Sequence, residues 1–227
     1  MPADPFLPGS SESRLEAANI LLDIQAVDFR PEEPYILTSG WASPVYIDCR
    51  KIISFPEARK RLMAMAVKLL NDRAGLGSVD AVAGGETAGI PFAAWIADAA
   101  EKPMLYVRKK AKGFGRNARI EGAPLAGTTV LLIEDLATDG ASKVNFVDAL
   151  RNAGMTAEHV FAIFFYDVFP GALDTLKDLG ITMHYLATWE DILIAVEQTR
   201  AFPEEAVREV RNFLAGPESW SKANGGK

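Results

Sequence analysis

The sequence predicts an α/β fold: a five-stranded parallel sheet flanked by helices, with a small hood from the N-terminal region. The first observation behind this prediction is that five short apolar runs alternate with amphipathic runs of helical length from residue 79 onward. This alternation is typical of βαβ units joined by right-handed crossovers. The second is that three of the apolar runs end in polar loops rich in glycine or charge. Ligands of parallel sheets bind at the carboxyl ends of the strands, so these loops are the candidate site.

Composition and charge limit the possible functions. The chain has 227 residues, of which 49% are hydrophobic and 24% charged, and its net charge is −6. The negative charge argues against a general nucleic-acid binder but not against an anionic substrate. The single cysteine, Cys49, excludes an internal disulfide and fits a cytoplasmic location, and we interpret it as a buried small hydrophobe. We expect no membrane association, because no apolar run approaches the ~20 residues that span a bilayer and residues 1–14 lack the apolar segment of a signal peptide.

The N-terminal quarter predicts a helix followed by the hood. Apolar residues recur at helical spacing from Ser13. Residues 35–54 contain two short apolar segments around a central turn, which indicates a hairpin outside the main sheet. Residues 55–70 predict the next helix. We therefore expect a single domain over residues 1–227, with the hood at about 13–55, the core at about 56–200, a C-terminal helix at about 203–215, and flexible ends at 1–14 and 221–227.

The first strand of the sheet, residues 79–83, runs into Gly84, Gly85, Glu86 and Thr87, and a helix follows at 88–100. The paired glycines would let a ligand approach the backbone closely. A tight turn between a strand and a helix needs glycines in any case, so this signal alone is weak.

The second strand, residues 103–107, empties into a cationic loop. Six of the 24 lysines and arginines of this acidic chain fall within a dozen residues, among several glycines: Arg108, Lys109, Lys110, Lys112, Arg116 and Arg119. A solvated basic loop is the simplest interpretation. The concentration of charge favours another, a mobile lid that neutralises phosphate and excludes water.

The third strand, residues 130–133, leads into Glu134 and Asp135, then a small polar loop at 138–142 and an amphipathic helix. A helix N-terminus after such a loop can bind a phosphate through free amide groups. The two carboxylates require another partner, either vicinal ribose hydroxyls or Mg²⁺. A ribose 5-phosphate would satisfy both features, whereas the alternative is a well-capped helix after an acidic turn.

Two further strands at 158–165 and 181–186 and helices at 173–179 and 187–198 complete the predicted fold. His159 and His184 lie within the apolar strands, and neither has a second histidine or cysteine at metal-ligand spacing. We therefore expect structural roles for both and no metal-binding histidine.

Four segments, in order, resemble orotate phosphoribosyltransferases of the type I phosphoribosyltransferase family. LTSGWASPVYIDCR is similar to their hood, GGETAGIPFAA to their pyrophosphate loop, YVRKKAKGFG to their catalytic loop and IEDLATDGAS to their phosphoribosyl pyrophosphate (PRPP) motif, and the similarity extends over about residues 20–196. The resemblance implies a homodimeric enzyme that transfers phosphoribose from PRPP to N1 of orotate, giving orotidine 5′-monophosphate and pyrophosphate in pyrimidine biosynthesis. It also implies a Mg²⁺ ion held mainly by PRPP.

The resemblance assigns roles to individual residues. The implied catalytic residues are Lys109, Lys112 and Asp135, and the base-binding residues are Tyr46 and Thr138. Residues 109–120 would be shared between the two subunits. The residues that would bind PRPP are Glu86, Thr87, Arg108, Lys109, Lys112, Glu134, Asp135, Thr138, Asp139, Gly140, Ala141 and Ser142.

At four positions the chain departs from residues common in that family: Thr38 replaces a lysine, Trp41 an arginine, Phe114 a histidine and Val168 the arginine that meets the orotate carboxylate. Either Arg50 or Arg119 could take over from the last. Two alternatives therefore stay open, a phosphoribosyltransferase for another base and a regulator that senses PRPP. A general nucleotide-binding protein has less support, because neither a GxxxxGK[ST] nor a GxGxxG pattern follows a strand.

Overall fold

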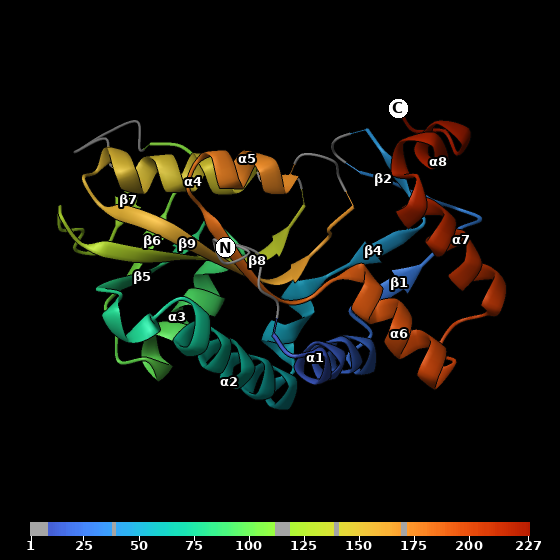
Figure 1. Ribbon diagram of the computed structural model, residues 1–227, viewed down its shortest axis with the longest axis horizontal. Helices are drawn as coiled ribbons and strands as arrows, with labels where there is room; N and C mark the ends of the chain where they lie inside the picture. Colours follow the sequence, from blue (N-terminus) through green and yellow to red (C-terminus); the bar gives the residue numbers. More distant parts are fainter. Residues whose placement is uncertain (1–8, 38–39, 112–118, 139–140, 169–171) are drawn as a thin grey trace, which may run out of the picture.

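The computed structural model describes residues 9–37, 40–111, 119–138, 141–168 and 172–227. Its centre is a six-stranded sheet in the order β10-β9-β8-β5-β6-β7 (Figure 1). The five parallel strands confirm the prediction; they are β5 (Ala81–Gly85), β6 (Met104–Val107), β8 (Thr129–Ala137), β9 (Thr156–Phe165) and β10 (Thr182–Ala187). The count of five was one short, because β7 (Ile120–Glu121) pairs antiparallel with β6 at the edge. The sixth strand is the chain returning from the cationic loop.

Helices cover both faces of the sheet (Figure 1). On one face lie α1 (Ser11–Asp23), α2 (Pro56–Arg73) and α3 (Gly89–Ala99), and on the other α4 (Ala141–Asn152) and α5 (Ala172–Asp178). Successive strand residues enter opposite cores: Leu131 and Phe161 belong to one hydrophobic cluster, Leu132 and Val160 to the other. This is the two-residue periodicity of a strand buried on both sides.

The hood consists of two short antiparallel pairs. The predicted hairpin is present as β2 (Tyr35–Ile36) and β3 (Ala42–Ser43). The second predicted segment is divided, because β4 (Val45–Ile47) pairs with β1 (Val27–Phe29), a strand that was not predicted. Pro44 lies between β3 and β4 and has no N–H for a ladder, which explains the break. The 3₁₀-helices η1 (Cys49–Ser54) and η2 (Leu76–Ser78) flank α2.

The C-terminal helices are α6 (Trp189–Thr199), α7 (Glu204–Ala215) and α8 (Pro217–Ala223), and Figure 1 shows α7 and α8 beside the hood strands. The expectation of a flexible tail was wrong. The buried Ser221 hydroxyl accepts from Ala42 N and donates to Lys227 O, each at 2.9 Å, and Lys227 N donates to Gly40 O at 3.0 Å. The tail therefore fixes β3 of the hood.

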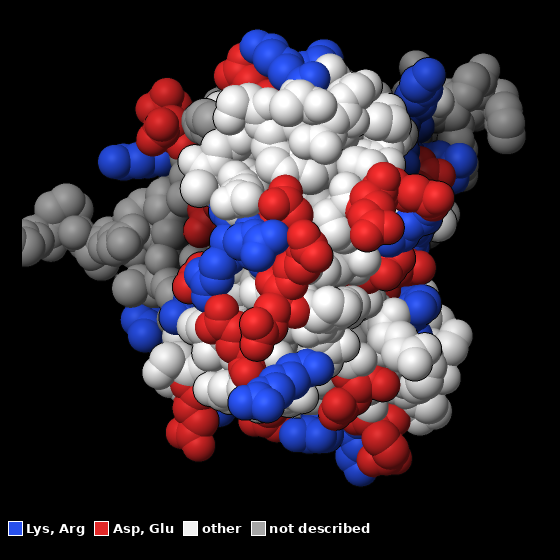
Figure 2. Space-filling view, turned by 90° about the vertical axis from the view of Figure 1, so that its right-hand side faces the viewer, with Lys and Arg blue, Asp and Glu red and all other residues white. Residues whose placement is uncertain are grey.

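On the face that carries these helices, acidic and basic side chains are interspersed (Figure 2). Several form ion pairs along or between helices, such as Lys222 with Glu218 at 2.7 Å and Arg211 with Glu197. Among the described residues, no helix combines the length and apolar character needed to cross a bilayer.

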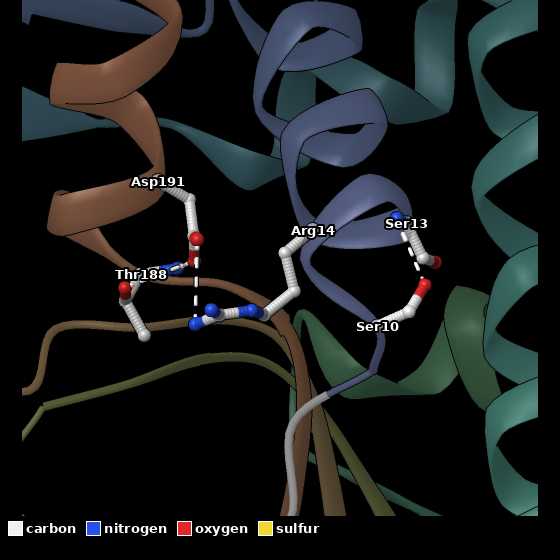
Figure 3. Close-up of polar contacts among 5 residues, drawn as sticks. All are labelled: Ser10, Ser13, Arg14, Thr188 and Asp191. Carbon is white, nitrogen blue, oxygen red and sulfur yellow. Dashed lines mark hydrogen bonds and ion pairs between the residues drawn. The ribbon is translucent and has the colours of Figure 1, made fainter.

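A polar contact joins the first helix to α6 (Figure 3). Arg14 Nη1 of α1 lies 3.3 Å from Asp191 Oδ1, while Asp191 Oδ2 accepts from the Thr188 backbone N–H at 2.9 Å and from its hydroxyl at 3.0 Å. Ser10 caps α1 by accepting from Ser13 N. One buried carboxylate thus caps α6 and holds α1 against it.

Candidate active site

A cavity of about 790 Å³ lies at the carboxyl ends of β5, β6 and β8, beneath residues of the hood. It collects most of the predicted site residues that the structure describes: Tyr46, Glu86, Thr87, Lys109, Glu134, Asp135 and Thr138. Four loops that are distant in sequence meet there, as the sheet topology requires. The structure brings these predicted residues together at the predicted edge of the sheet.

The two carboxylates occupy different surroundings. We expected the strand to end before them, but β8 continues to Ala137, so Glu134 and Asp135 are consecutive strand residues. Consecutive side chains of a strand point to opposite faces. Both line the cavity, and burial raises the pKa of each carboxyl group. The Lys143 ammonium opposes the effect of burial on the pKa of both groups.

Glu134 is nearly sealed inside the protein. It is 7% exposed, and burial raises its pKa to about 7, against the opposing effect of the Lys143 ammonium. Oε2 lies 3.8 Å from Lys143 Nζ, while Oε1 has no hydrogen-bond partner among the described residues. A buried acceptor without a partner is costly, and this oxygen packs against Gly85 of β5.

The glycines before Glu86 serve packing within the protein. We expected them to lie in a loop and to admit a ligand, yet both belong to β5. A Cβ at Gly85 would overlap Oε1 of Glu134, and one at Gly84 would lie 2.7 Å from Ile90 Cα. The close approach that needs glycine is thus made by a carboxylate and by α3.

Two charged cavity residues, Lys143 and Asp48, were missed by the sequence reasoning. Lys143 is 3% exposed, and its ammonium donates to Leu136 O at 2.5 Å. It lies in the first turn of α4, where the helix dipole disfavours a cation. This unfavourable position was the sequence signal that could have identified Lys143, because a lysine on the surface would be more stable elsewhere on the helix.

Tyr46, Asp48 and Arg50 form the hood side of the cavity. Arg50 donates from Nη2 to the Tyr46 hydroxyl at 3.2 Å and from Nε to Asp48 Oδ1 at 3.1 Å. Cys49 beside them is buried, and burial raises the pKa of its thiol, in agreement with the expected hydrophobic role.

Of the two arginines considered as partners for a carboxylate, only Arg50 lines the cavity. Arg119 is bound to the ends of the cationic loop. Val168, at the position of the missing arginine, packs against the hydrophobic core.

The cationic loop contributes Lys109 to the cavity. The Lys109 backbone N–H donates to Glu86 Oε2 at 2.7 Å, which joins this loop to the turn after β5. Arg108 is placed differently from the prediction, because it faces Glu121 at 3.4 Å and does not line the cavity. Lys112, Asp139 and Gly140 lie outside the described residues, as do Thr38 and Phe114. Ala141 and Ser142 begin α4, so their backbone stands where the phosphate site was predicted.

The donor set bears on a metal ion. In the described part of the chain, no group of three or more histidine, cysteine, aspartate or glutamate side chains could hold one.

Known proteins resemble this chain over nearly its whole length. No family model matches it, but an orotate phosphoribosyltransferase of Ruegeria sp. (strain TM1040) is 52% identical over 217 residues, 96% of each chain. One from Rhizobium meliloti is 50% identical over 209 residues, 92% of this chain and 90% of that one.

Solved structures agree with these relatives. The crystal structure of orotate phosphoribosyltransferase from Aeropyrum pernix matches with a TM-score of 0.69 and 28% identity, covering 82% of this chain and 99% of that one. Adenine phosphoribosyltransferase from Leishmania tarentolae shares the fold alone, with a TM-score of 0.60 and 15% identity over 86% and 96% of the two chains. Relatives this similar over this much of the sequence establish the family, and the chain belongs to the orotate phosphoribosyltransferases.

Proposed function

We propose that the cavity transfers the 5-phosphoribosyl group of PRPP to N1 of orotate. The bond from C1 of ribose to the pyrophosphate oxygen breaks, a bond from C1 to N1 forms, and the products are orotidine 5′-monophosphate, pyrophosphate and the proton released from N1. The observation that carries the proposal is the convergence of the hood, the turn after β5, the cationic loop and the end of β8 on one cavity of about 790 Å³. Each belongs to a segment that resembles a motif of this family.

PRPP would lie along the floor of the cavity. Backbone amides at the start of α4 would bind the 5′-phosphate, with Thr138 beside it. Asp135 and Glu134, which both line the cavity, would accept hydrogen bonds from the ribose hydroxyls. Glu86, Thr87 and Lys109 would flank the pyrophosphate, where the lysine neutralises charge on the departing group.

Orotate would bind on the hood side. The Tyr46 ring lines the cavity and offers a face for the pyrimidine. Arg50 is the arginine of the hood that lines the cavity, so we assign it to the orotate carboxylate, in place of the arginine replaced by Val168. Its present hydrogen bonds to Asp48 and Tyr46 hold the guanidinium at the edge of this face.

We further propose that the reaction requires Mg²⁺, that the enzyme is a homodimer and that it is located in the cytoplasm. Mg²⁺ bound with PRPP would neutralise the pyrophosphate as charge develops on it. The loop over residues 109–120 would complete the partner's cavity in a homodimer. The buried, unpaired Cys49 is compatible with a reducing compartment.

Loss of orotate absorbance in the ultraviolet tests the proposal, with PRPP and Mg²⁺ added to the purified protein. We expect consumption of orotate that requires PRPP and stops when a chelator removes the metal. Consumption of uracil or a purine base in its place would favour a phosphoribosyltransferase for another base. Binding of PRPP by calorimetry without turnover of any base would favour the PRPP-sensing alternative.

A further inference from the structure

Arg119 closes the base of the cationic loop. The Arg108 N–H donates to Arg119 O at 2.7 Å, which extends the β6–β7 ladder by one step. The Arg119 guanidinium folds back over this junction and donates to Arg108 O at 3.1 Å and Lys109 O at 3.3 Å. The two ends of the loop are therefore joined by both backbone and side chain.

The same guanidinium reaches α4. Arg119 Nη2 donates to Asn145 Oδ1 at 3.1 Å and to Asn145 O at 3.3 Å, and Asn145 Nδ2 donates to Lys109 O at 3.5 Å. Asn145 lies one turn into α4, the helix whose N-terminus we assign to the 5′-phosphate. The loop is thus attached to the phosphate-binding helix by two polar side chains, which we call the Arg119–Asn145 clamp.

The clamp acts on the backbone of one active-site residue. Lys109 has its carbonyl held by Arg119 and Asn145, while its N–H is held by Glu86 at 2.7 Å. Its side chain lines the cavity. Three segments, the turn after β5, the loop and α4, therefore fix the backbone from which the lysine extends.

The acceptors of Arg119 distinguish the clamp from an ordinary surface ion pair. In the described part of the chain they are all neutral oxygens, and the side chain is only half-exposed. Nε and Nη2 make these contacts, and Nη2 shares its two hydrogens among four acceptors. The rigid guanidinium plane fixes both nitrogens together, which a lysine ammonium on a flexible stem cannot do. This arrangement sets geometry at the cost of desolvating a cation.

We propose that Arg119 and Asn145 are positioning residues that hold Lys109 in place for departure of the pyrophosphate. The proposal rests on the proposed function for its kinetic consequence. A displacement of about 1 Å at a reacting group can cost about 100-fold in rate, so loss of the clamp should lower kcat more than it raises the KM for PRPP.

The kinetic test uses Arg119→Lys, Asn145→Ala and the double variant, with Asn152→Ala as a control at the exposed end of α4. We expect each clamp variant to lower kcat at least ~10-fold with a change of less than ~3-fold in the KM for PRPP. The double variant should be no worse than the poorer single one, since the two residues act as a unit. A loss of kcat that is accompanied by a matching loss of thermal stability, or an unchanged kcat, would overturn the proposal.

A second measurement does not depend on turnover. Trypsin cleaves after Lys109 and Lys110, and we expect cleavage there to accelerate in both single variants while the midpoint of thermal unfolding stays near that of Asn152→Ala. Unchanged cleavage would overturn the clamp itself, even if the protein lacked the proposed transferase activity. Faster cleavage with an unchanged kcat would show a role in structure alone and would overturn positioning.

Discussion

Among single residues, the contact of Gly85 with Glu134 makes a sharp prediction. A side chain at Gly85 would overlap Oε1 of Glu134, and Phe146 stands 2.8 Å from the same point. Gly85→Ala should therefore displace the carboxylate and weaken PRPP binding by at least ~10-fold, with a loss of stability of about 1–3 kcal/mol from overpacking. Calorimetric titration with PRPP and urea unfolding measure the two effects. Gly77→Ala, where nothing lies within 4 Å, is the matched control. Unchanged PRPP affinity in Gly85→Ala would contradict this account of Glu134.

Arg50 carries the prediction about the base. Arg50→Gln removes a charge from the cavity wall and should raise the KM for orotate by ~10–100-fold, because a charge-assisted contact to a carboxylate contributes about 1.5–3 kcal/mol. The KM for PRPP should change little. Steady-state kinetics with each substrate varied in turn separate the two. Lys60→Gln removes the same charge from the exposed surface of α2 and should leave both constants unchanged. A larger increase in the KM for PRPP than in the KM for orotate would contradict the assignment of Arg50 to the orotate carboxylate.

The sequence predicted the residues whose chemistry is conspicuous. Carboxylates after an apolar strand and a cluster of cations in a glycine-rich loop together predict a binding site for a phosphate compound. It did not predict Lys143 in the cavity, because a lysine in an amphipathic helix is usually solvated. Nor could it decide between Arg50 and Arg119, because that choice depends on which loop folds over the cavity.

The contact between α1 and α6 gives a prediction for whole elements. Asp191→Asn removes the charge that faces Arg14 and weakens the cap at Thr188. Because Asp191 is 3% exposed, we expect a loss of about 3 kcal/mol in the free energy of unfolding, as for other broken buried ion pairs. Urea unfolding checks this value, with Asp174→Asn on the exposed face of α5 as the control. A loss below about 0.5 kcal/mol, no larger than that of the control, would contradict it.

Helices and strands could be predicted from the sequence where their burial is periodic. The parallel strands and their helices were predicted to within a few residues, because each has a continuous apolar run or an amphipathic repeat. Apart from the hairpin of β2 and β3, short elements were missed. β1 and β7 have three and two residues, too few for a pattern, and their pairing is decided by neighbours distant in sequence. α8 and the tail dock through one buried hydroxyl on β3, which composition does not reveal.

The contribution of one histidine pair to the stability of the molecule should fall at mildly acidic pH. His159 Nδ1 lies 3.0 Å from His184 Nε2, on the adjacent strands β9 and β10. Burial lowers the pKa of His184 from 6.5 to about 4, and the nearby charges of His159 and Arg73 lower it further. Burial also lowers the pKa of His159, against the opposing effect of Glu158. The unfolded chain therefore takes up protons before the folded one.

The resulting stability is fully present above about pH 6.5 and is lost as the pH falls toward about 4, amounting to about 3 kcal/mol from His184. Glu134, whose pKa burial raises to about 7, acts in the opposite direction over the same range, so the effect of His184 is read from a difference between two proteins. The unfolding free energy of His184→Gln relative to that of the unaltered protein should rise between pH 7 and pH 5. Parallel pH profiles for the two proteins, measured by urea unfolding, would show that other groups govern acid stability.

The central claim is that the cavity beside Asp135 is where PRPP reacts with orotate. PRPP-dependent loss of orotate absorbance, measured in parallel for the unaltered protein, Asp135→Asn and Asp148→Asn, tests it most directly. Asp148 is exposed on α4 and lies outside the cavity lining, so its variant controls for loss of a carboxylate. We predict turnover in the unaltered protein and in Asp148→Asn, and a loss of about 100-fold in Asp135→Asn at an unchanged unfolding midpoint. Full turnover in Asp135→Asn, or none in the unaltered protein, would contradict the account.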